Sequence, residues 1–139
     1  MSSFSIKSHR PGVVYSIPHF FILNKGNNSG KPLTVPCPNC FVIHFQCEEV
    51  KEQIYWLSYS LWQSKAFYPF LRGSVIPFVV LRDVKFCLQD GLNKVDKNPA
   101  QFEKAVAALR SLEAMEKQYK QNLLLIANAK RMLFYKYIC

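Results

Sequence analysis

The sequence predicts an α+β fold with a small mixed or antiparallel sheet, two shorter helices and a long C-terminal amphipathic helix. Three observations support this prediction. Short apolar runs lie in the first half of the chain, apolar residues at helical spacing follow them, and a seven-residue apolar repeat fills residues 99–139. With 139 residues, half of them hydrophobic, the chain suits one domain that buries a substantial core.

The first half of the chain carries the strand signals. Residues 1–18 are expected to be extended or irregular, because two prolines and a glycine interrupt them. The aromatic and aliphatic run at residues 19–23 predicts a buried strand, and the Asn-, Gly- and Lys-rich residues 24–32 predict a loop. Residues 41–47 predict a second strand, with alternating faces. One face carries Phe41, Ile43, Phe45 and Cys47, and the other carries Val42, His44 and Gln46.

Residues 48–64 predict the first helix. Glu48 and Glu49 at its start complement the helix dipole, and Pro69 prevents the helix from continuing. An apolar stripe at helical spacing consists of Ile54, Leu57 and Leu61.

The middle of the chain predicts a further strand and a short helix. Residues 74–80 predict a strand, which must be an edge strand or contain a bulge because Pro77 cannot donate to the sheet. Residues 81–89 predict a short helix that ends at Asp90–Gly91, and residues 92–98 predict a polar linker.

The last part of the chain predicts a helix from Pro99 to about Tyr137. A straight helix of this length would span roughly 50 Å, so we expect it to project or to break into a hairpin near residues 113–117. We divide the chain into an α+β globular part, residues 1–98, and the helix or helical hairpin of the same domain, residues 99–139. The seven-residue repeat predicts either packing on the domain or pairing with a second copy or another protein. The residues expected at such an oligomer interface are Ala105, Leu112, Tyr119, Ile126 and Leu133.

Charge distribution indicates a polyanionic partner. Lysine and arginine outnumber acidic residues 18 to 9, and residues 1–47 and 117–139 contain basic residues but no acid. This pattern favours double-stranded DNA over an anionic membrane, and ordinary solubility charge is the alternative. No apolar run approaches the ~18 residues of a membrane span, so no membrane is expected.

The sequence contains no recognisable catalytic constellation. Its three histidines, His9, His19 and His44, are scattered, and its acids lack the paired spacing of general acid–base sites. We therefore expect a non-enzymatic protein without a cofactor. Five cysteines, an odd number, and the lack of a secretory segment predict a reducing, cytoplasmic location.

One cysteine motif leaves a zinc site open as an alternative. Cys37, Cys40, His44 and Cys47 follow ligand-like spacing. However, the predicted strand places His44 and Cys47 on opposite faces, so ordinary buried or half-buried cysteines are the favoured interpretation.

The loop at residues 24–32 is interpreted as a basic, Asn-rich turn. Only three residues separate Gly26 from Gly30, and Pro32 follows Lys31, so it lacks the phosphate-binding loop pattern. Such a turn can still contact DNA phosphates through lysine and backbone N–H groups. The first helix also carries aromatic residues that suit either base stacking or the core, and we favour the core. The aromatic residues of this helix are Tyr55, Trp56, Tyr59 and Trp62.

Three segments carry a family resemblance. They are Ile54–Leu57, Leu61–Phe67 and Gly73–Phe78, the last reading Gly-Ser-Val-Ile-Pro-Phe, with a long helix after them. The chain resembles the target-recognition domain of type I restriction-modification specificity subunits, although such a subunit has two recognition domains and two long helices. It also resembles a group of short uncharacterised proteins of Bacteroides-type bacteria.

The first resemblance implies a DNA-recognition module whose loops face the major groove and whose helix joins partners. On loop position and charge, the expected phosphate contacts are Lys25, Lys31, Lys65 and Arg72. Asn27 and Asn28 are expected to read adenine edges, because amide side chains pair with adenine. A protein-interaction or regulatory adaptor acting through the C-terminal helix is the alternative function.

Overall fold

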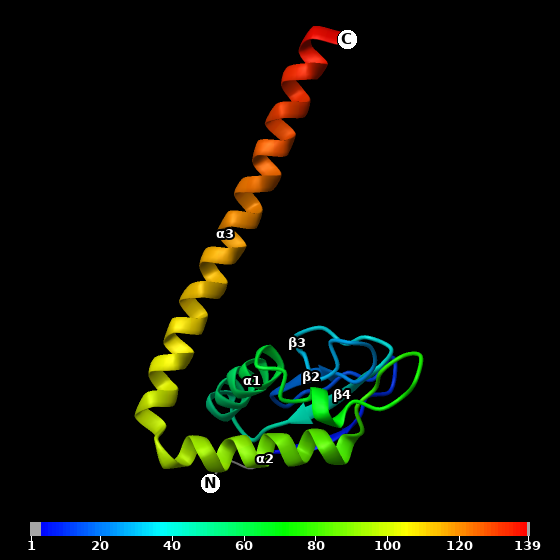
Figure 1. The fold of residues 1–139 in the computed structure, drawn as a ribbon, viewed down its shortest axis with the longest axis vertical. Helices are drawn as coiled ribbons and strands as arrows, with labels where there is room; N and C mark the ends of the chain where they lie inside the picture. The colour runs from blue at the N-terminus through cyan, green and yellow to red at the C-terminus, as the bar shows by residue number, and fades with distance from the viewer. Residues whose placement is uncertain (1–3, 139) are drawn as a thin grey trace. The chain divides into compact units, whose positions relative to one another are not determined.

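The computed structural model describes residues 4–138 and confirms the α+β prediction (Figure 1). Two compact units divide the chain, Met1–Lys97 and Asn98–Cys139. The first unit contains a four-stranded antiparallel sheet, two α-helices and a short 3₁₀ helix, and the second contains one long helix. In chain order the elements are β1 (Ser5–Ser8), β2 (His19–Leu23), β3 (Pro32–Leu33), β4 (Cys40–His44), α1 (Glu48–Gln63), η1 (Tyr68–Phe70), α2 (Leu81–Lys97) and α3 (Pro99–Ile138).

The sheet has the strand order β1-β4-β2-β3, with every neighbouring pair antiparallel. His19 pairs with His44 between β2 and β4, so these two side chains point to the same face. Strand β1 lies in the region expected to be extended or irregular. Its residues carry no alternating pattern, and backbone pairing with β4 is what makes them a strand.

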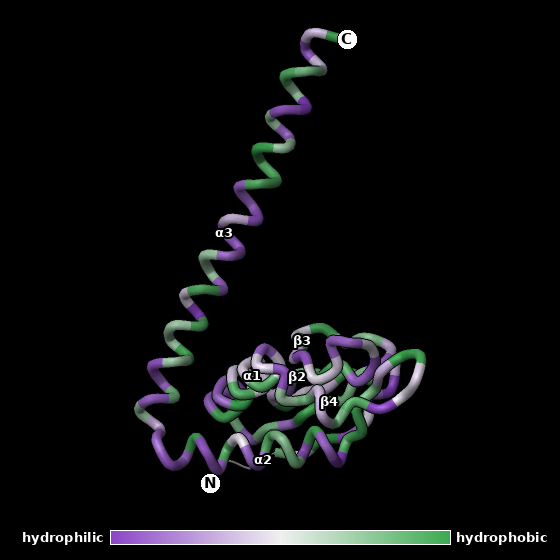
Figure 2. The backbone as a smooth tube through the Cα atoms, in the orientation of Figure 1, coloured by the Kyte–Doolittle hydropathy of each residue, from purple (hydrophilic) through white to green (hydrophobic). Residues whose placement is uncertain are grey.

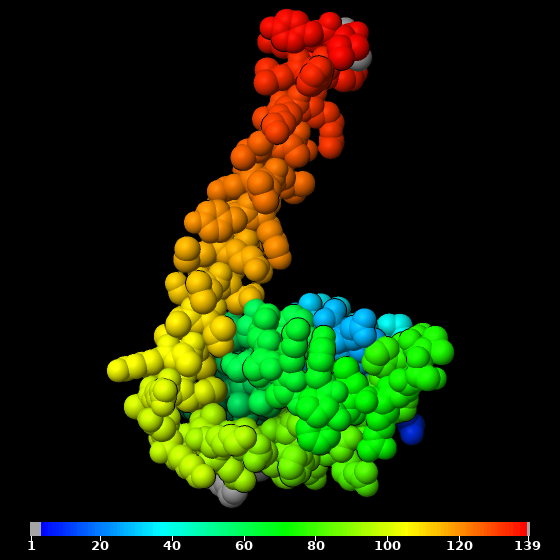
Figure 3. Space-filling model, in the orientation of Figure 1, coloured from blue at the N-terminus to red at the C-terminus, as the bar shows by residue number. Residues whose placement is uncertain are grey.

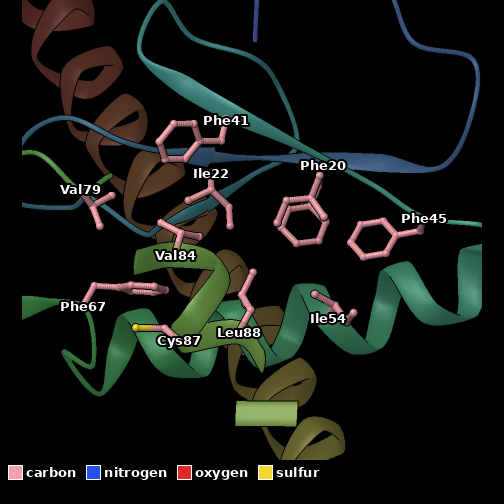
Figure 4. Close-up of a cluster of buried hydrophobic side chains, with 11 residues drawn as sticks. Phe20, Ile22, Phe41, Phe45, Ile54, Phe67, Val79, Val84, Cys87 and Leu88 are labelled. Atoms are coloured by element: carbon pink, nitrogen blue, oxygen red, sulfur yellow. The ribbon is translucent and has the colours of Figure 1, made fainter. Parts of the chain in front are cut away.

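The main core lies between one face of the sheet and helices α1 and α2 (Figure 4). Phe20 and Ile22 of β2 and Ile43 of β4 are 1% exposed or less, and they meet Ile54 of α1 and Leu88 of α2. Each such side chain contributes about 1.5–3 kcal/mol when fully buried. The rest of this cluster consists of Phe41, Phe45, Phe67, Val79, Val84 and Cys87.

On the opposite face of the sheet, residues of the loops and of β3 pack against the central strands. Phe21 and Val42 are buried there together with Cys40, and Tyr15 and Leu33 pack against them. This face therefore carries a second, smaller cluster.

Helix α1 ends in a Schellman motif. The Ala66 N–H donates to the Leu61 carbonyl at 2.9 Å, and the Lys65 N–H donates to the Trp62 carbonyl at 3.1 Å. This motif requires a left-handed residue at its turn, and Lys65 has a φ of 62°. Glycine is the residue usually found at this position, because any Cβ there is strained.

The prediction of a strand at residues 74–80 is wrong, because this segment is assigned to no strand. Arg72 and Phe78 exchange two backbone hydrogen bonds of 2.9 Å, which close residues 73–77 into a loop. Gly73 has a φ of 97°, and Pro77 lacks an N–H for pairing. Val75 is 88% exposed, and pairing in the described part of this segment is limited to isolated bridges of Phe78 with Arg72 and with Lys25.

The predicted end of the second helix at Asp90–Gly91 is also wrong, because α2 continues to Lys97. A Cβ at Gly91 would lie 3.1 Å from the Leu57 side chain. The glycine therefore serves close packing of α2 on α1 rather than ending the helix.

Helix α3 runs without a break from Pro99 to Ile138. Asn98 caps it, since its Oδ1 accepts from the Gln101 N–H at 3.3 Å and its Nδ2 donates to Gln101 Oε1 at 3.0 Å. Of the two expected alternatives, a projecting helix or a break near residues 113–117, the break does not occur, because this segment consists of strong helix formers. Hydrophobic and hydrophilic residues alternate along its length (Figure 2). Within residues 4–138, none of the helices combines the length and apolar character of a membrane span.

Candidate nucleic-acid interface

The loop between β2 and β3 is a compact, ordered turn. The Gly30 N–H donates to the Leu23 carbonyl at 2.7 Å, and the buried Ser29 donates from both its N–H and its Oγ to the Gly26 carbonyl. Gly26 and Gly30 have φ values of 97° and 99°, which the tight turn requires. Asn27 and Asn28, at the tip between the glycines, are exposed.

This loop packs on the segment that follows α1. Gly30 lies directly against the Phe67 ring, leaving no room for a Cβ. The Gly26 N–H donates to the Pro77 carbonyl at 2.7 Å, and the Val79 N–H donates to the Asn24 carbonyl at 3.0 Å. Two segments far apart in the sequence therefore form one surface, and Figure 3 shows blue-to-cyan atoms beside green ones there.

The four predicted phosphate contacts lie on these two adjoining segments, and we call them the loop cations: Lys25, Lys31, Lys65 and Arg72. Lys25 and Arg72 both form backbone bridges with Phe78. The Lys31 Nζ lies 5.1 Å from the centre of the Trp62 ring, and the Lys65 Nζ lies 5.3 Å from the centre of the Tyr68 ring. Residues 24–31 and 62–80 contain no aspartate or glutamate, so neither segment itself contributes an acid.

Arg72 differs from the other loop cations because it has a carboxylate partner. Its Nη2 lies 3.2 Å from Asp83 Oδ2, and the Asp83 side chain is only 14% exposed. This ion pair orients the guanidinium and offsets part of its charge. Arg72 is therefore expected to attract a phosphate less strongly than the lysines.

The aromatic residues of α1 form a row that leads to Lys31. Successive ring centres from Tyr55 through Trp56 and Tyr59 to Trp62 are 5.4, 5.5 and 5.7 Å apart. All four side chains are half-buried, whereas the fully buried residues of α1 are Ile54, Leu57 and Ser58. The rings thus lie at the edge of the core.

The structure brings together the three histidines that are scattered in the sequence. They surround Tyr15 on the sheet face opposite the helices, with ring centres 5.6 Å (His9), 5.3 Å (His19) and 4.9 Å (His44) from its ring. His9 Nδ1 and the Tyr15 hydroxyl are hydrogen-bonded at 2.9 Å. Strand alternation alone could not reveal this cluster, because it depends on the register between β2 and β4.

His44 is the buried member of that cluster. Among the residues that the structure describes, neither of its ring nitrogens has a hydrogen-bond partner. Burial lowers the pKa of His44, and the positive charges of Lys7 and His19 lower it further. Both effects favour the neutral form of the imidazole.

The zinc ligands suggested by the cysteine spacing are not assembled. Cys40 is buried and its thiol donates to the Cys37 carbonyl, whereas Cys47 is exposed at the start of α1. In the described part of the chain, no group of three or more His, Cys, Asp or Glu side chains could hold a metal ion. Burial raises the pKa of the Cys40 thiol and, helped by two nearby acids, that of the Cys87 thiol to about 11.

The five residues predicted for an oligomer interface all lie on α3 and are all exposed. The four large ones are between 52% and 62% exposed, and no residue among those described in α3 is buried. The five predicted interface residues are Ala105, Leu112, Tyr119, Ile126 and Leu133.

Comparison with known proteins identifies a family but not an activity. Residues 6–136 match the model of a family described as Family of unknown function (DUF6943). Neither the curated proteins nor the solved structures include a match. Because the family model covers nearly the whole chain, the protein belongs to the DUF6943 family of unknown function.

Proposed function

We propose that this protein is a non-enzymatic, cytoplasmic DNA-binding module that contacts duplex phosphates through the loop cations. One observation carries the proposal: two distant segments, both free of acids, are packed together and carry four cations between them. Lysine and arginine that neutralise phosphates release counterions, which supplies affinity for DNA.

The backbone at Lys65 supports a functional role for this lysine. A lysine in the left-handed region costs roughly 1–2 kcal/mol relative to glycine. Strain of this kind is typical of functional positions, where the side chain is needed despite its cost. A phosphate contact gives a reason for lysine at a position that favours glycine.

The loop tip supports a role in reading bases. Asn27 and Asn28 are exposed between two glycines, and the loop is braced by Ser29 and by its contact with Phe67. An amide side chain reads adenine through two hydrogen bonds in the major groove. This arrangement agrees with the resemblance to specificity subunits, and recognition in a restriction system is part of the proposal.

Binding to duplex DNA as a function of salt tests the proposal. Each phosphate contact contributes roughly 0.9 to the slope of log K against log salt. A triple variant, Lys25→Ala, Lys31→Ala and Lys65→Ala, should therefore lower the slope by roughly 2–3. The matched control changes Lys85, Lys94 and Lys97 of α2 to Ala and should leave most of the slope intact. Equal effects of the two variants, or no duplex binding at low salt, would contradict the proposal.

Helix α3 favours a second candidate function, a protein-interaction adaptor. Its exposed apolar residues are typical of a helix that packs against a partner. This function predicts partner binding that does not respond to DNA, and loss of binding when Leu112 and Ile126 are replaced by Asp.

A further inference from the structure

Two cysteines lie in contact at the turn that leads into β4. Cys40 is the first residue of that strand and is 2% exposed, and its thiol donates to the Cys37 carbonyl at 3.1 Å. Cys37 is half-buried and packs against the small cluster on the sheet that contains Cys40. The two thiols are also hydrogen-bonded to each other. The fold therefore places both sulfur atoms side by side.

The turn that carries these cysteines is conformationally restricted. A proline stands on each side of Cys37, where each fixes its own φ and the second disfavours helical backbone at Cys37 itself. The Asn39 carbonyl accepts from the Asn24 N–H at 3.0 Å, and the Cys40 carbonyl accepts from the His9 N–H at 3.1 Å. Because the turn is already ordered, joining the two sulfurs costs little further conformational entropy.

The two thiols differ in reactivity because they differ in burial. Burial raises the pKa of the Cys40 thiol, and its interaction with the Cys37 thiol raises this pKa further. The thiolate is the reactive form of cysteine, so the buried Cys40 is the poorer nucleophile. Since thiol–disulfide exchange depends on access as well as on the thiolate fraction, Cys37 is the thiol that an external disulfide meets first.

We propose that Cys37 and Cys40 form a reversible disulfide by exchange with a low-molecular-weight disulfide such as glutathione disulfide, with Cys37 as the attacking thiol. The deprotonated Cys37 sulfur attacks one sulfur of glutathione disulfide and breaks its S–S bond, and the departing glutathione thiolate takes up a proton. Cys40 then loses its proton and attacks the Cys37 sulfur, which releases the second glutathione as a thiol. In total the two cysteines lose two electrons and two protons, and one glutathione disulfide becomes two glutathione thiols.

Redox sensing is the role that follows for this pair. In a reducing compartment the two thiols stay reduced, and disulfides that do form there are usually transient. The pair is then oxidised only when glutathione disulfide accumulates. The new bond joins two residues that are already in contact, so the pairing of Cys40 with Leu23 in the sheet stays in place.

Equilibration of the full chain with mixtures of glutathione and glutathione disulfide tests the proposal. Remaining thiols are blocked with iodoacetamide, and the peptide that contains Cys37 and Cys40 is analysed by mass spectrometry. The disulfide between them should form at a lower ratio of glutathione disulfide to glutathione in the native chain than in the same chain unfolded in urea. A native chain that keeps both thiols reduced throughout the series, or an equal midpoint in urea, would overturn the proposal.

Single variants test the order in which the two thiols react. In a Cys47→Ser background, which removes the exposed thiol before α1, Cys40→Ala should accumulate one glutathione on Cys37. Cys37→Ala should leave Cys40 unmodified, because its thiol is buried. The matched control is Cys87→Ala, which removes another buried thiol and should leave the disulfide unaffected. Equally rapid modification of Cys40 in the Cys37→Ala variant would overturn the assigned order, and none of these results depends on DNA binding.

Discussion

Gly30 lies so close to the Phe67 ring that a Cβ at this position would overlap the ring. Phe67 is 1% exposed and belongs to the main core, so the β2–β3 loop is held directly against that core. The contact joins the two segments that carry the loop cations. The packing of these two segments on each other therefore depends on Gly30, which composition alone marks only as a turn residue.

Gly30→Ala should destabilise the first unit by about 2–4 kcal/mol, combining a strained positive φ with overpacking against Phe67. The matched control is Gly26→Ala, because Gly26 has nearly the same φ but nothing within 4 Å of its Cβ position. That control should cost only the backbone strain, about 1–2 kcal/mol. Denaturant unfolding measures both, and equal losses would show that the ring contact adds nothing.

Lys65→Gly should separate stability from binding. Removing the Cβ relieves the left-handed strain, and we expect the free energy of unfolding to rise by about 1 kcal/mol. Duplex binding should weaken, with the salt slope falling by roughly 0.9. Lys65→Ala keeps the Cβ and should lose the same binding without gaining stability. If Lys65→Gly binds DNA like the wild type, Lys65 does not contact phosphate.

Replacing Asn27 and Asn28 by Ala should reduce discrimination between DNA sequences while leaving the salt slope unchanged. An adenine contact by an amide side chain contributes about 1–3 kcal/mol of discrimination, and amides carry no charge. Selection of bound sequences from a random duplex library measures the change. An unaltered preference in the double variant would exclude these residues as base readers.

His44 should make the first unit less stable in mild acid. Its folded pKa lies below its ordinary value of 6.5, so the unfolded chain binds the proton more readily. Stability from this group is present above pH 6.5 and is lost as the pH falls through 6.5 toward the folded pKa. Thermal unfolding between pH 7.5 and pH 5 measures this loss as a fall in the melting temperature.

His44→Phe should flatten that pH dependence and raise stability at every pH. The substitution removes two buried ring nitrogens that have no partner among the described residues, and each such group costs about 1–3 kcal/mol. A phenyl ring can keep the edge contact with Tyr15. A variant less stable than the wild type would indicate that the imidazole makes a hydrogen bond in solution.

Local sequence determined the elements whose signals lie within a few residues. The start of α1 was predicted from Glu48 and Glu49 and from the apolar stripe that follows them. Strand β2 was predicted from the apolar run at residues 19–23. The seven-residue apolar repeat after Pro99 predicted a helix to about Tyr137, and α3 ends at Ile138. The four loop cations were predicted as phosphate contacts from charge and loop position, because glycine and asparagine mark turns locally, and that role stays a prediction.

Tertiary structure decided everything that depends on a distant neighbour. Gly91 stands inside α2 because Leu57 packs on it, and residues 73–77 close into a loop because Arg72 and Phe78 pair with each other. His19 and His44 meet only in the register that β2 and β4 adopt, and a slip of one residue would move His44 to the other face. Such contacts join residues far apart along the chain, so no local pattern of apolar or charged residues could specify them.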